Sequence, residues 1–335
     1  MDIKEIEKVM ISQGYENEYI ELCTSYASNL NENGFPVIFD SIHLAMLIGI
    51  DVKELYSYYI LAENLYKEVN IPKRTGGNRK ISMPCENLKY IQKWILDNVL
   101  YKEKCSESST GFMPHKSIVD NAKLHVNKEC IINLDIKDFF PNIKYMQIYN
   151  LFCEFGYSRH LSMVFSGLCT YKSVLPQGAP TSPYLSNLIC KRLDAKLLDL
   201  ANFIEASYTR YADDITFSGE KKIAKHIKLI RKIIINENFI INEKKVRVQF
   251  KHHKQVVTGL VVNTKLSVPR KTKKYLRQQI YYAKKYGVKD SLERQNITKS
   301  NYRGHLFGYA YFIRMVEEHI GDKFIEQLCS IDWES

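Results

Sequence analysis

The chain has 335 residues, of which 45% are hydrophobic and 12% aromatic, so it can bury a sizeable core and is neither disordered nor of low complexity. Lys and Arg (48) outnumber Asp and Glu (37), and the net charge of +11 favours a polyanionic partner. The first residues are charged, and no apolar run approaches the roughly 20 residues that span a bilayer, so we expect no signal peptide and no membrane association. The eight cysteines form no close pair, which predicts reduced thiols in a cytoplasmic protein.

The positive charge is concentrated in one stretch. Residues 1–70 carry 4 basic and 12 acidic side chains, residues 71–243 carry 25 and 17, and residues 290–335 carry 5 and 8. Residues 244–289 carry 14 basic side chains and no acidic one. A solvated Lys-rich surface is the alternative interpretation, but a long stretch without a carboxylate favours a surface that binds nucleic acid.

Residues 1–68 are predicted to be helical. Apolar-periodic stretches at 6–11 and 42–61 flank a break at Asn33-Gly34-Phe35-Pro36, with Ser41 as a candidate cap of the second stretch and Gly49 as an interruption. The net negative charge of this extension argues against its binding nucleic acid by charge.

The middle of the chain mixes strands and helices. Residues 66–84 predict a hairpin around Gly76-Gly77-Asn78, and residues 89–100 a helix. The apolar run 130–136 predicts a core strand that reaches Asp135. Ser182-Pro183 opens a helix whose apolar stripe continues to Leu197.

The last elements follow the same mixed order. Residues 208–217 predict two short strands around Ala212-Asp213-Asp214, and residues 223–235 a helix. Further strands are expected at 246–250 and 256–262, and a helix from Pro269 to Gly287. Because strands and helices do not alternate regularly, the predicted class is α+β.

Two acidic sites carry the candidate chemistry. Asp135 ends a buried strand, and Asp213 and Asp214 occupy the tip of a hairpin. Carboxylates gathered in a cleft need a compensating cation, and two divalent ions held by neighbouring strands would catalyse nucleotidyl transfer. Taken alone, an Asp-Asp pair is more often a turn on a solvated hairpin.

The order of the motifs indicates more than the pair does. A Pro176-Gln177-Gly178 loop lies between the two acidic sites, and Tyr211-Ala212 precedes Asp213. With Phe140 after Asp135, this set resembles the reverse transcriptase family in that family's motif order. Arg79-Lys80-Ile81 and Asn242-Glu243-Lys244-Lys245 are similar to its flanking motifs, and the resemblance covers residues 70–335.

Two further elements resemble those of retron reverse transcriptases. Asn121-Ala122-Lys123-Leu124-His125 is similar to the retron Asn-Ala-x-x-His element, and Val257-Thr258-Gly259 to the retron Val-Thr-Gly element. Alternatively, Asn121 and His125 form an ordinary pair on one helical face, and Val257-Thr258-Gly259 is a strand with a glycine bulge.

The resemblance implies a right-hand polymerase fold with fingers, a palm built on an antiparallel sheet, and a short helical thumb. The expected domains are a helical N-terminal extension (1–68), fingers and palm (69–263) and a thumb that begins with a basic helix (264–335). The acidic extension is expected to cover the fingers or to contact a protein partner. In this α+β architecture the basic stretch 244–289 runs from the palm into the thumb.

The resemblance also implies site residues. Asp135, Asp213, Asp214 and the carbonyl of Ile136 would bind two Mg²⁺ ions, for which Mn²⁺ is a possible substitute. Lys245 is the candidate proton donor to pyrophosphate, with Lys244 equally close in sequence. Nucleotide binding is expected from Arg79, Lys73, Phe140, Gln177 and Gly178. Phe140 matches the position that blocks a ribose 2′-hydroxyl, although packing of Phe139 and Phe140 in the core is an alternative.

Contacts to RNA and to the template–primer duplex are expected along the retron elements and the first thumb helix, namely at Asn121, His125, Val257, Thr258, Gly259, Lys271, Lys273, Lys274 and Arg277. Resemblance to retrons implies reverse transcription of a cognate non-coding RNA of the msr–msd type. The product would be a branched, RNA-linked single-stranded DNA primed from a guanosine 2′-hydroxyl. The resemblance further implies dNTP substrates, bacterial anti-phage defence and a separate effector protein. The rivals are a reverse transcriptase of the group II intron or diversity-generating lineage and a non-catalytic RNA-binding scaffold.

Overall fold

The structure is a computed structural model that describes residues 3–72, 76–298 and 300–334. It divides into two compact units that interleave in sequence. Unit 1 comprises Met1–Phe112, Ile136–Lys196 and Ile234–Ile240, and unit 2 comprises Met113–Asp135, Leu197–Ile233 and Ile241–Ser335. Each unit is described by itself.

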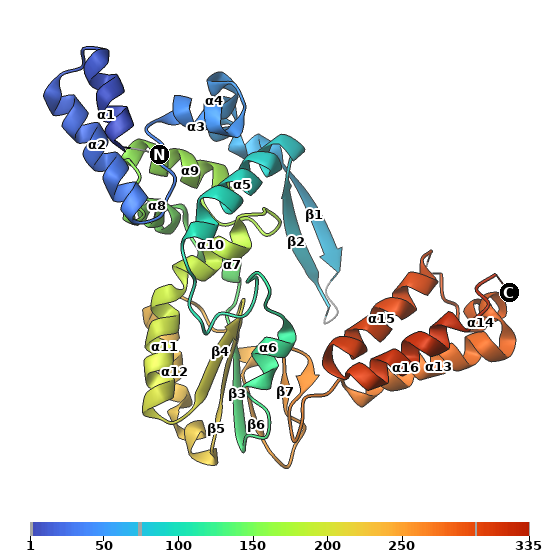
Figure 1. Cartoon of the computed structure of the whole chain (residues 1–335). Helices are drawn as coiled ribbons and strands as arrows, with labels where there is room; N and C mark the ends of the chain where they lie inside the picture. The colour runs from blue at the N-terminus through green and yellow to red at the C-terminus, as the bar shows by residue number, and fades with distance from the viewer. Residues whose placement is uncertain (1–2, 73–75, 299, 335) are drawn as a thin grey trace. The chain divides into compact units, whose positions relative to one another are not determined.

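Unit 1 begins with the predicted helical extension (Figure 1). Its elements are α1 (Ile3–Ser12), α2 (Asn17–Glu32), α3 (Ser41–Ile48), α4 (Val52–Ile60) and the short η1 (Ala62–Leu65). Gly49 ends α3 in a left-handed conformation, so the interruption predicted there is confirmed. The predicted cap is wrong by one residue, because the Asp40 carboxylate accepts the His43 N–H while Ser41 lies in the first turn.

The extension packs on the helices that follow in the same unit. Phe35 stacks on Phe155 with ring centroids 4.4 Å apart, and the Tyr157 hydroxyl donates to the Pro36 carbonyl at 3.1 Å. The first helix pair is more open, since Tyr19 and Leu22 on α2 are exposed. The extension therefore covers part of unit 1 and leaves an apolar stripe on the surface.

The remainder of unit 1 carries the predicted hairpin and a group of helices. Its elements are β1 (Tyr66–Pro72), β2 (Asn78–Pro84), α5 (Glu86–Asn98), η2 (Leu100–Lys102), α7 (Phe139–Asn142), α8 (Tyr145–Glu154), α9 (Arg159–Cys169), α10 (Ser182–Ile189) and the start of α11 (Lys191–Phe203). β1 and β2 pair antiparallel, from Tyr66 opposite Pro84 to Pro72 opposite Asn78. The single helix predicted after Ser182 is two helices, because α10 ends at Ile189 and α11 begins at Lys191.

Unit 2 is built on an antiparallel sheet with strand order β4-β5-β3-β6. Its elements are α6 (Ile118–Lys123), β3 (Cys130–Asp135), β4 (Ser207–Tyr211), β5 (Asp214–Gly219), η3 (Lys221–His226), the greater part of α12 (Ile227–Asn236), η4 (Glu243–Lys245) and β6 (Arg247–Phe250). The predicted core strand β3 lies inside the sheet, and Cys130, Ile131 and Ile132 are fully buried. Figure 1 shows these strands side by side.

The C-terminal part of unit 2 consists of a small hairpin followed by helices. They are β7 (Val256–Val257), β8 (Leu260–Val261), α13 (Arg270–Tyr286), α14 (Val288–Arg294), α15 (Tyr302–Val316) and α16 (Glu318–Cys329). The continuous strand predicted at 256–262 is wrong, because Thr258 and Gly259 form a two-residue turn. Val257, Leu260, Leu276 and Leu306 belong to one hydrophobic cluster, so the packing crosses the boundary predicted at residues 263 and 264.

In the part of the chain that the structure describes, no helix is both long and apolar enough to cross a membrane. The eight cysteines all lie in the described residues, and none of them forms a disulfide.

Candidate active site

The three predicted catalytic carboxylates come together at one end of the unit 2 sheet. Asp135 on β3 lies directly opposite Asp214 on β5, and Asp213 occupies the turn between β4 and β5. The turn is tight, since Tyr211 pairs with Asp214 across only Ala212 and Asp213. Because the register of two antiparallel strands sets this pairing, the backbone itself holds the carboxylates close together.

The turn that carries Asp213 has a strained backbone, which is held by a hydrogen bond from a buried arginine. Ala212 has φ +56°, a left-handed value that glycine adopts more readily than alanine. The fully buried Arg210 donates from Nη1 to the Ala212 carbonyl at 3.2 Å. This hydrogen bond holds the turn in the conformation that projects Asp213.

Asp135 is held by two residues from the segment just before β6. Lys245 Nζ lies 2.6 Å from Asp135 Oδ2, and Asn242 Nδ2 donates to Asp135 Oδ1 at 3.0 Å. The Asn242 backbone N–H also donates to the Asp135 carbonyl at 2.8 Å. Sequence reasoning left Asn242 out of the site, although it belongs to a flanking motif. Of the two candidate lysines, Lys245 is the one that contacts the Asp135 carboxylate.

The electrostatics of the cluster show an excess of negative charge. Asp214 is open to solvent on one side, but desolvation by the surrounding protein and the charges of Asp213 and Asp135 raise its pKa to about 7. For Lys245, partial burial would lower the pKa, but the hydrogen bond and charge of Asp135 outweigh it and raise the pKa. Lys245 is therefore a charged ammonium at neutral pH.

The donor set fits divalent cations, although the carboxylates are not yet arranged around one. Within residues 3–72, 76–298 and 300–334, no three His, Cys, Asp or Glu side chains form a ready-made metal site. The carboxylate oxygens of Asp135 are occupied by Lys245 and Asn242 instead. Carboxylate oxygens are the ligands that Mg²⁺ prefers, and the raised pKa of Asp214 marks uncompensated charge that a cation would neutralise. Ile136 has no donor atom in its side chain, so its backbone carbonyl is the candidate ligand.

We expect divalent cations to stabilise the protein more at high pH than at low pH. The pKa of Asp214 is raised from 3.8 to about 7, so its charge destabilises the metal-free fold progressively from about pH 4 upward, and fully above pH 7. Thermal unfolding with Mg²⁺ or Mn²⁺ should show an increase in Tm of about 2 °C or more at pH 8 and little at pH 5.5.

The test variant is Asp214→Asn, which should raise the metal-free Tm at pH 8 and abolish the difference between the metal-induced Tm shifts at pH 8 and pH 5.5. The matched control is Asp290→Asn, which neutralises an exposed carboxylate on α14 and should leave that difference unchanged. An equal metal-induced shift at both pH values would contradict the assignment.

The predicted nucleotide-binding residues that the structure describes lie in unit 1. Arg79 is exposed on β2, opposite Ile71. The Gln177 carbonyl accepts the Ser82 N–H at 2.8 Å, which joins the loop before α10 to the same strand. A Cβ on Gly178 would lie 2.6 Å from the Ser82 carbonyl oxygen, so only glycine fits there. Lys73 lies outside the described residues.

Phe139 and Phe140 differ in burial, which bears on the two roles considered above, packing in the core and exclusion of a ribose 2′-hydroxyl. Phe139 is buried and its ring lies 6.1 Å from that of Phe239. Phe140 is half-buried, with its ring 6.0 Å from that of Phe112. Phe139 is therefore the core residue of the pair, and Phe140 is the one with an accessible ring.

The predicted RNA contacts at Asn121, His125 and Val257 need correction. Their exposed fractions are 1%, 0% and 0%, so these side chains cannot touch RNA directly. His125 hydrogen-bonds Thr209 and Ser218 instead. The turn residues of the second element differ, because Thr258 is half-buried and Gly259 is exposed.

The predicted basic face lies along α13. Lys271, Lys274 and Arg277 are exposed and line a groove on this helix. Lys273 is different, because both carboxylate oxygens of Glu317 lie within 3.0 Å of its ammonium and only 18% of its side chain is exposed. Glu317 also accepts the Val268 N–H at 2.9 Å, so this ion pair ties the start of α13 to the α15–α16 corner.

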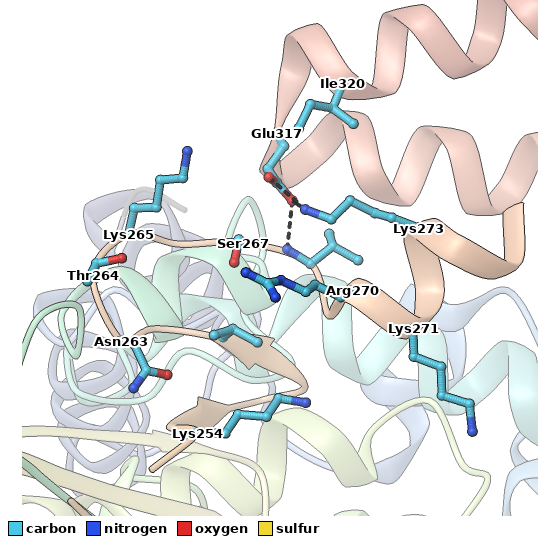
Figure 2. A pocket seen from close by; sticks show the side chains of 12 residues that line it. Lys254, Asn263, Thr264, Lys265, Ser267, Arg270, Lys271, Lys273, Glu317 and Ile320 are labelled. Carbon is cyan, nitrogen blue, oxygen red and sulfur yellow. Dashed lines mark hydrogen bonds and ion pairs between the residues drawn. The ribbon is translucent and has the colours of Figure 1, made fainter. Parts of the chain in front are cut away.

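A pocket of about 650 Å³ continues this face toward the β7–β8 hairpin. Its basic lining residues are Lys254, Lys265, Arg270, Lys271 and Lys273. Figure 2 shows Lys265 and Lys271 extending away from the Glu317–Lys273 pair, with Arg270 between hairpin and helix. The arrangement offers several cations to an extended polyanion.

Comparison with known proteins agrees with these motifs. The family reverse transcriptase (RNA-dependent DNA polymerase) matches residues 71–280. The Ec86 retron reverse transcriptase of Escherichia coli is 36% identical over 258 residues, which cover 76% of this chain and 81% of that protein. The chain belongs to the retron reverse transcriptases. Two Myxococcus xanthus retron reverse transcriptases, Mx162 and Mx65, are each 31% identical to this chain. The match to Mx162 covers 90% of this chain and 68% of that protein. The match to Mx65 covers 86% of this chain and 71% of that protein.

Membership fixes the general activity. This retron reverse transcriptase is an RNA-directed DNA polymerase with a right-hand polymerase fold, and it takes an RNA template. Reverse transcriptases depend on a divalent metal, which agrees with the carboxylate donors at the end of the sheet. The predicted family and activity are confirmed, whereas the domain limits and the site residues not corrected above stay predictions.

Proposed function

We propose that this enzyme reverse-transcribes a cognate non-coding RNA of the msr–msd type from a guanosine 2′-hydroxyl into branched, RNA-linked single-stranded DNA. The catalytic part of this proposal is supported by the register of β3 and β5, which places Asp135 opposite Asp214, and by the contact of the Lys245 ammonium with the Asp135 carboxylate. The retron-type relatives support the choice of RNA and product.

The carboxylate end of the sheet would carry the transfer chemistry. Asp135, Asp213 and Asp214 would hold two Mg²⁺ ions, which when bound activate the attacking hydroxyl and stabilise the leaving pyrophosphate. Asn242 orients the Asp135 carboxylate. Lys245 leaves Asp135 as the charge there is neutralised and donates its proton to the departing pyrophosphate, for which its charged ammonium is suited.

The unit 1 residues would bind the incoming dNTP. Arg79 is exposed and its guanidinium matches phosphate oxygens. Gln177 and Gly178 would contribute loop backbone to the same site, and their contact with Ser82 fixes that loop against β2, the strand that carries Arg79. Lys73 stays a proposed triphosphate contact.

Phe140 is proposed to exclude ribonucleotides by occupying the space of a 2′-hydroxyl. Phe140→Val should raise the ratio of rNTP to dNTP incorporation by roughly 10-fold or more, because removal of the ring admits the extra oxygen. Single-nucleotide incorporation with each substrate measures this ratio. Phe203→Ala removes a ring that is 81% exposed and serves as the control. An unchanged ratio in Phe140→Val would assign the discrimination to another residue.

The basic face would bind RNA mainly through phosphate contacts. Lys271, Lys274 and Arg277 form the exposed stripe of α13, and the neighbouring pocket adds Lys254 and Lys265. A-form duplexes are recognised largely by shape and backbone, which suits such a surface. RNA affinity should therefore fall by about tenfold or more between about 50 and 200 mM salt.

The test uses the purified enzyme with its co-purifying RNA, dNTPs and Mg²⁺. We expect a DNA product joined to RNA through a 2′ linkage, identified by sequencing and by sensitivity to debranching. Asp213→Ala/Asp214→Ala should give no product. A product from that variant would overturn the catalytic assignment, and a product that lacks the 2′ linkage would overturn the retron priming.

The wider setting follows from the same proposal. The enzyme would act in the bacterial cytoplasm, in anti-phage defence, with a separate effector protein. The acidic extension, whose apolar stripe includes Tyr19 and Leu22, is a candidate contact for a protein partner.

A further inference from the structure

The two elements typical of retron enzymes meet inside unit 2. α6, which carries Asn121, packs against β4 and β8. Hydrogen bonds join this segment to the sheet on one side and to the β7–β8 turn on the other. The elements lie more than 130 residues apart in sequence, so their contact is a feature of the fold.

His125 anchors the segment to the sheet. Its Nδ1 lies 2.7 Å from Ser218 Oγ on β5, and its Nε2 lies 2.8 Å from Thr209 Oγ1 on β4. Burial lowers the pKa of His125 to about 3, so the ring is neutral, with one nitrogen donating and the other accepting. Both ring nitrogens are thus satisfied inside the protein, and the end of α6 is fixed on two strands.

Asn121 reaches the turn from the same helix. Its Nδ2 donates to Thr258 Oγ1 at 3.4 Å, and Thr258 Oγ1 donates to the Ile118 carbonyl at 3.3 Å. The Thr258 hydroxyl therefore uses both its donor and its acceptor capacity on α6. The neighbouring turn residue has no such contact, because Gly259 carries no side chain.

The turn needs this support because its backbone is unfavourable for threonine. Thr258 has φ +44° and Gly259 has φ +84°, the positive pair of a two-residue hairpin turn in which Asn-Gly is preferred. A β-branched residue in the left-handed region is strained and persists where the surroundings hold it. Contacts from α6 supply that restraint.

The other side of the turn is open. Gly259 is exposed, and a Cβ built on it would meet no atom within 4 Å. The same hairpin lines the basic pocket, through Lys254 before β7 and Val261 on β8. The turn thus presents bare backbone on a small element that also contributes to the cationic surface.

We propose that Asn121 and His125 are positioning residues, which hold the exposed Thr258–Gly259 turn so that its backbone contacts RNA. The chain of contacts runs from the sheet through His125 and α6 to Asn121 and then to the Thr258 hydroxyl. This inference rests on the proposed RNA-binding function and adds the class of contact, a backbone approach at Gly259, together with the residues that place it.

A matched pair of variants at Thr258 tests the restraint. Thr258→Val keeps the shape but removes the hydroxyl, and Thr258→Ser keeps the hydroxyl but removes the branch. We expect Thr258→Val to weaken binding of the co-purifying RNA by about 5- to 30-fold, and Thr258→Ser by no more than about twofold. On a primed template, Thr258→Val should raise KM and leave kcat unchanged, because the catalytic carboxylates are not touched.

A double-mutant cycle tests the connection to α6. If Asn121 acts through Thr258, then Asn121→Ala/Thr258→Val should bind RNA no more weakly than the worse single variant. Additive losses would show that the two residues act separately and would overturn the relay.

The exposed side is tested with Gly259→Asn. Asparagine tolerates positive φ, so the turn should persist while its side chain blocks the backbone, and RNA affinity should fall by about tenfold at unchanged Tm. Gly34→Asn makes the same change at another open glycine, with φ +77°, in the N-terminal extension and should not affect RNA binding.

The outcomes separate the two proposals. Wild-type enzyme that binds no RNA would overturn the proposed function and this inference with it. Wild-type binding that Thr258→Val and Gly259→Asn leave unaltered would overturn the inference alone. Equal losses in Thr258→Val and Thr258→Ser would show that the hydroxyl contact with α6 is not what positions the turn.

Discussion

Asp213→Asn is expected to reduce DNA synthesis by on the order of 10³-fold or more while RNA binding and folding are retained. The substitution keeps the size of the side chain but removes the charge that, with Asp135 and Asp214, would hold the metal ions. Losses of this size follow removal of single groups that act in the transition state. Single-nucleotide incorporation under single-turnover conditions measures the effect.

The control is Asp290→Asn, which neutralises an exposed carboxylate on α14 in the same unit and should keep full activity. Retained RNA affinity and an unchanged far-UV CD spectrum in Asp213→Asn would assign the loss to chemistry. A residual rate within about tenfold of wild type would contradict the role of this turn, since a charge-dependent site cannot tolerate the amide.

Replacing Lys271, Lys274 and Arg277 together by Ala should weaken RNA binding by at least about 100-fold at low salt. Each exposed cation is proposed to neutralise about one phosphate, so the slope of log K against log salt should become shallower by about 2 to 3. Fluorescence anisotropy with the co-purifying RNA over a salt series measures both quantities. The triple variant Lys8→Ala/Lys53→Ala/Lys93→Ala removes the same charge from exposed sites in unit 1 and is the matched control.

A substitution at Lys273, on the same helix, distinguishes an effect on protein stability from an effect on RNA binding. Because its ammonium is paired with Glu317, Lys273→Met should lower the stability of unit 2 by about 1–3 kcal/mol and leave the salt slope unchanged. Thermal unfolding and the salt series distinguish the two effects. If Lys273→Met instead changed the slope as much as Lys271→Ala, the ion pair would not persist when RNA binds.

Local patterns in the sequence were sufficient for the elements with strong signals. The apolar run before Asp135 predicted a buried strand, and β3 ends at that residue. Pro269 and Gly287 predicted the limits of α13, which spans Arg270–Tyr286. The order of the acidic motifs also predicted the family, and the register of β3 and β5 explains why those residues belong together.

The contacts that could not be predicted from the sequence are those between residues far apart along the chain. Asn121 and His125 were predicted to contact RNA because they match the retron Asn-Ala-x-x-His element. They are buried because Thr258, Ser218 and Thr209 satisfy them from distant strands. No local pattern shows such partners, and the same holds for Glu317, which removes Lys273 from the exposed basic face.

The β2 strand also had an unsuspected partner. The Ser82 N–H donates to the Gln177 carbonyl, and Gly178 lies too close to the Ser82 carbonyl for any side chain. These contacts fix the loop before α10 to β2. A displacement of the β1–β2 hairpin would therefore move the loop as well. Arg79 and Gln177 would then reach a nucleotide together, and its capture would follow a single kinetic step rather than two.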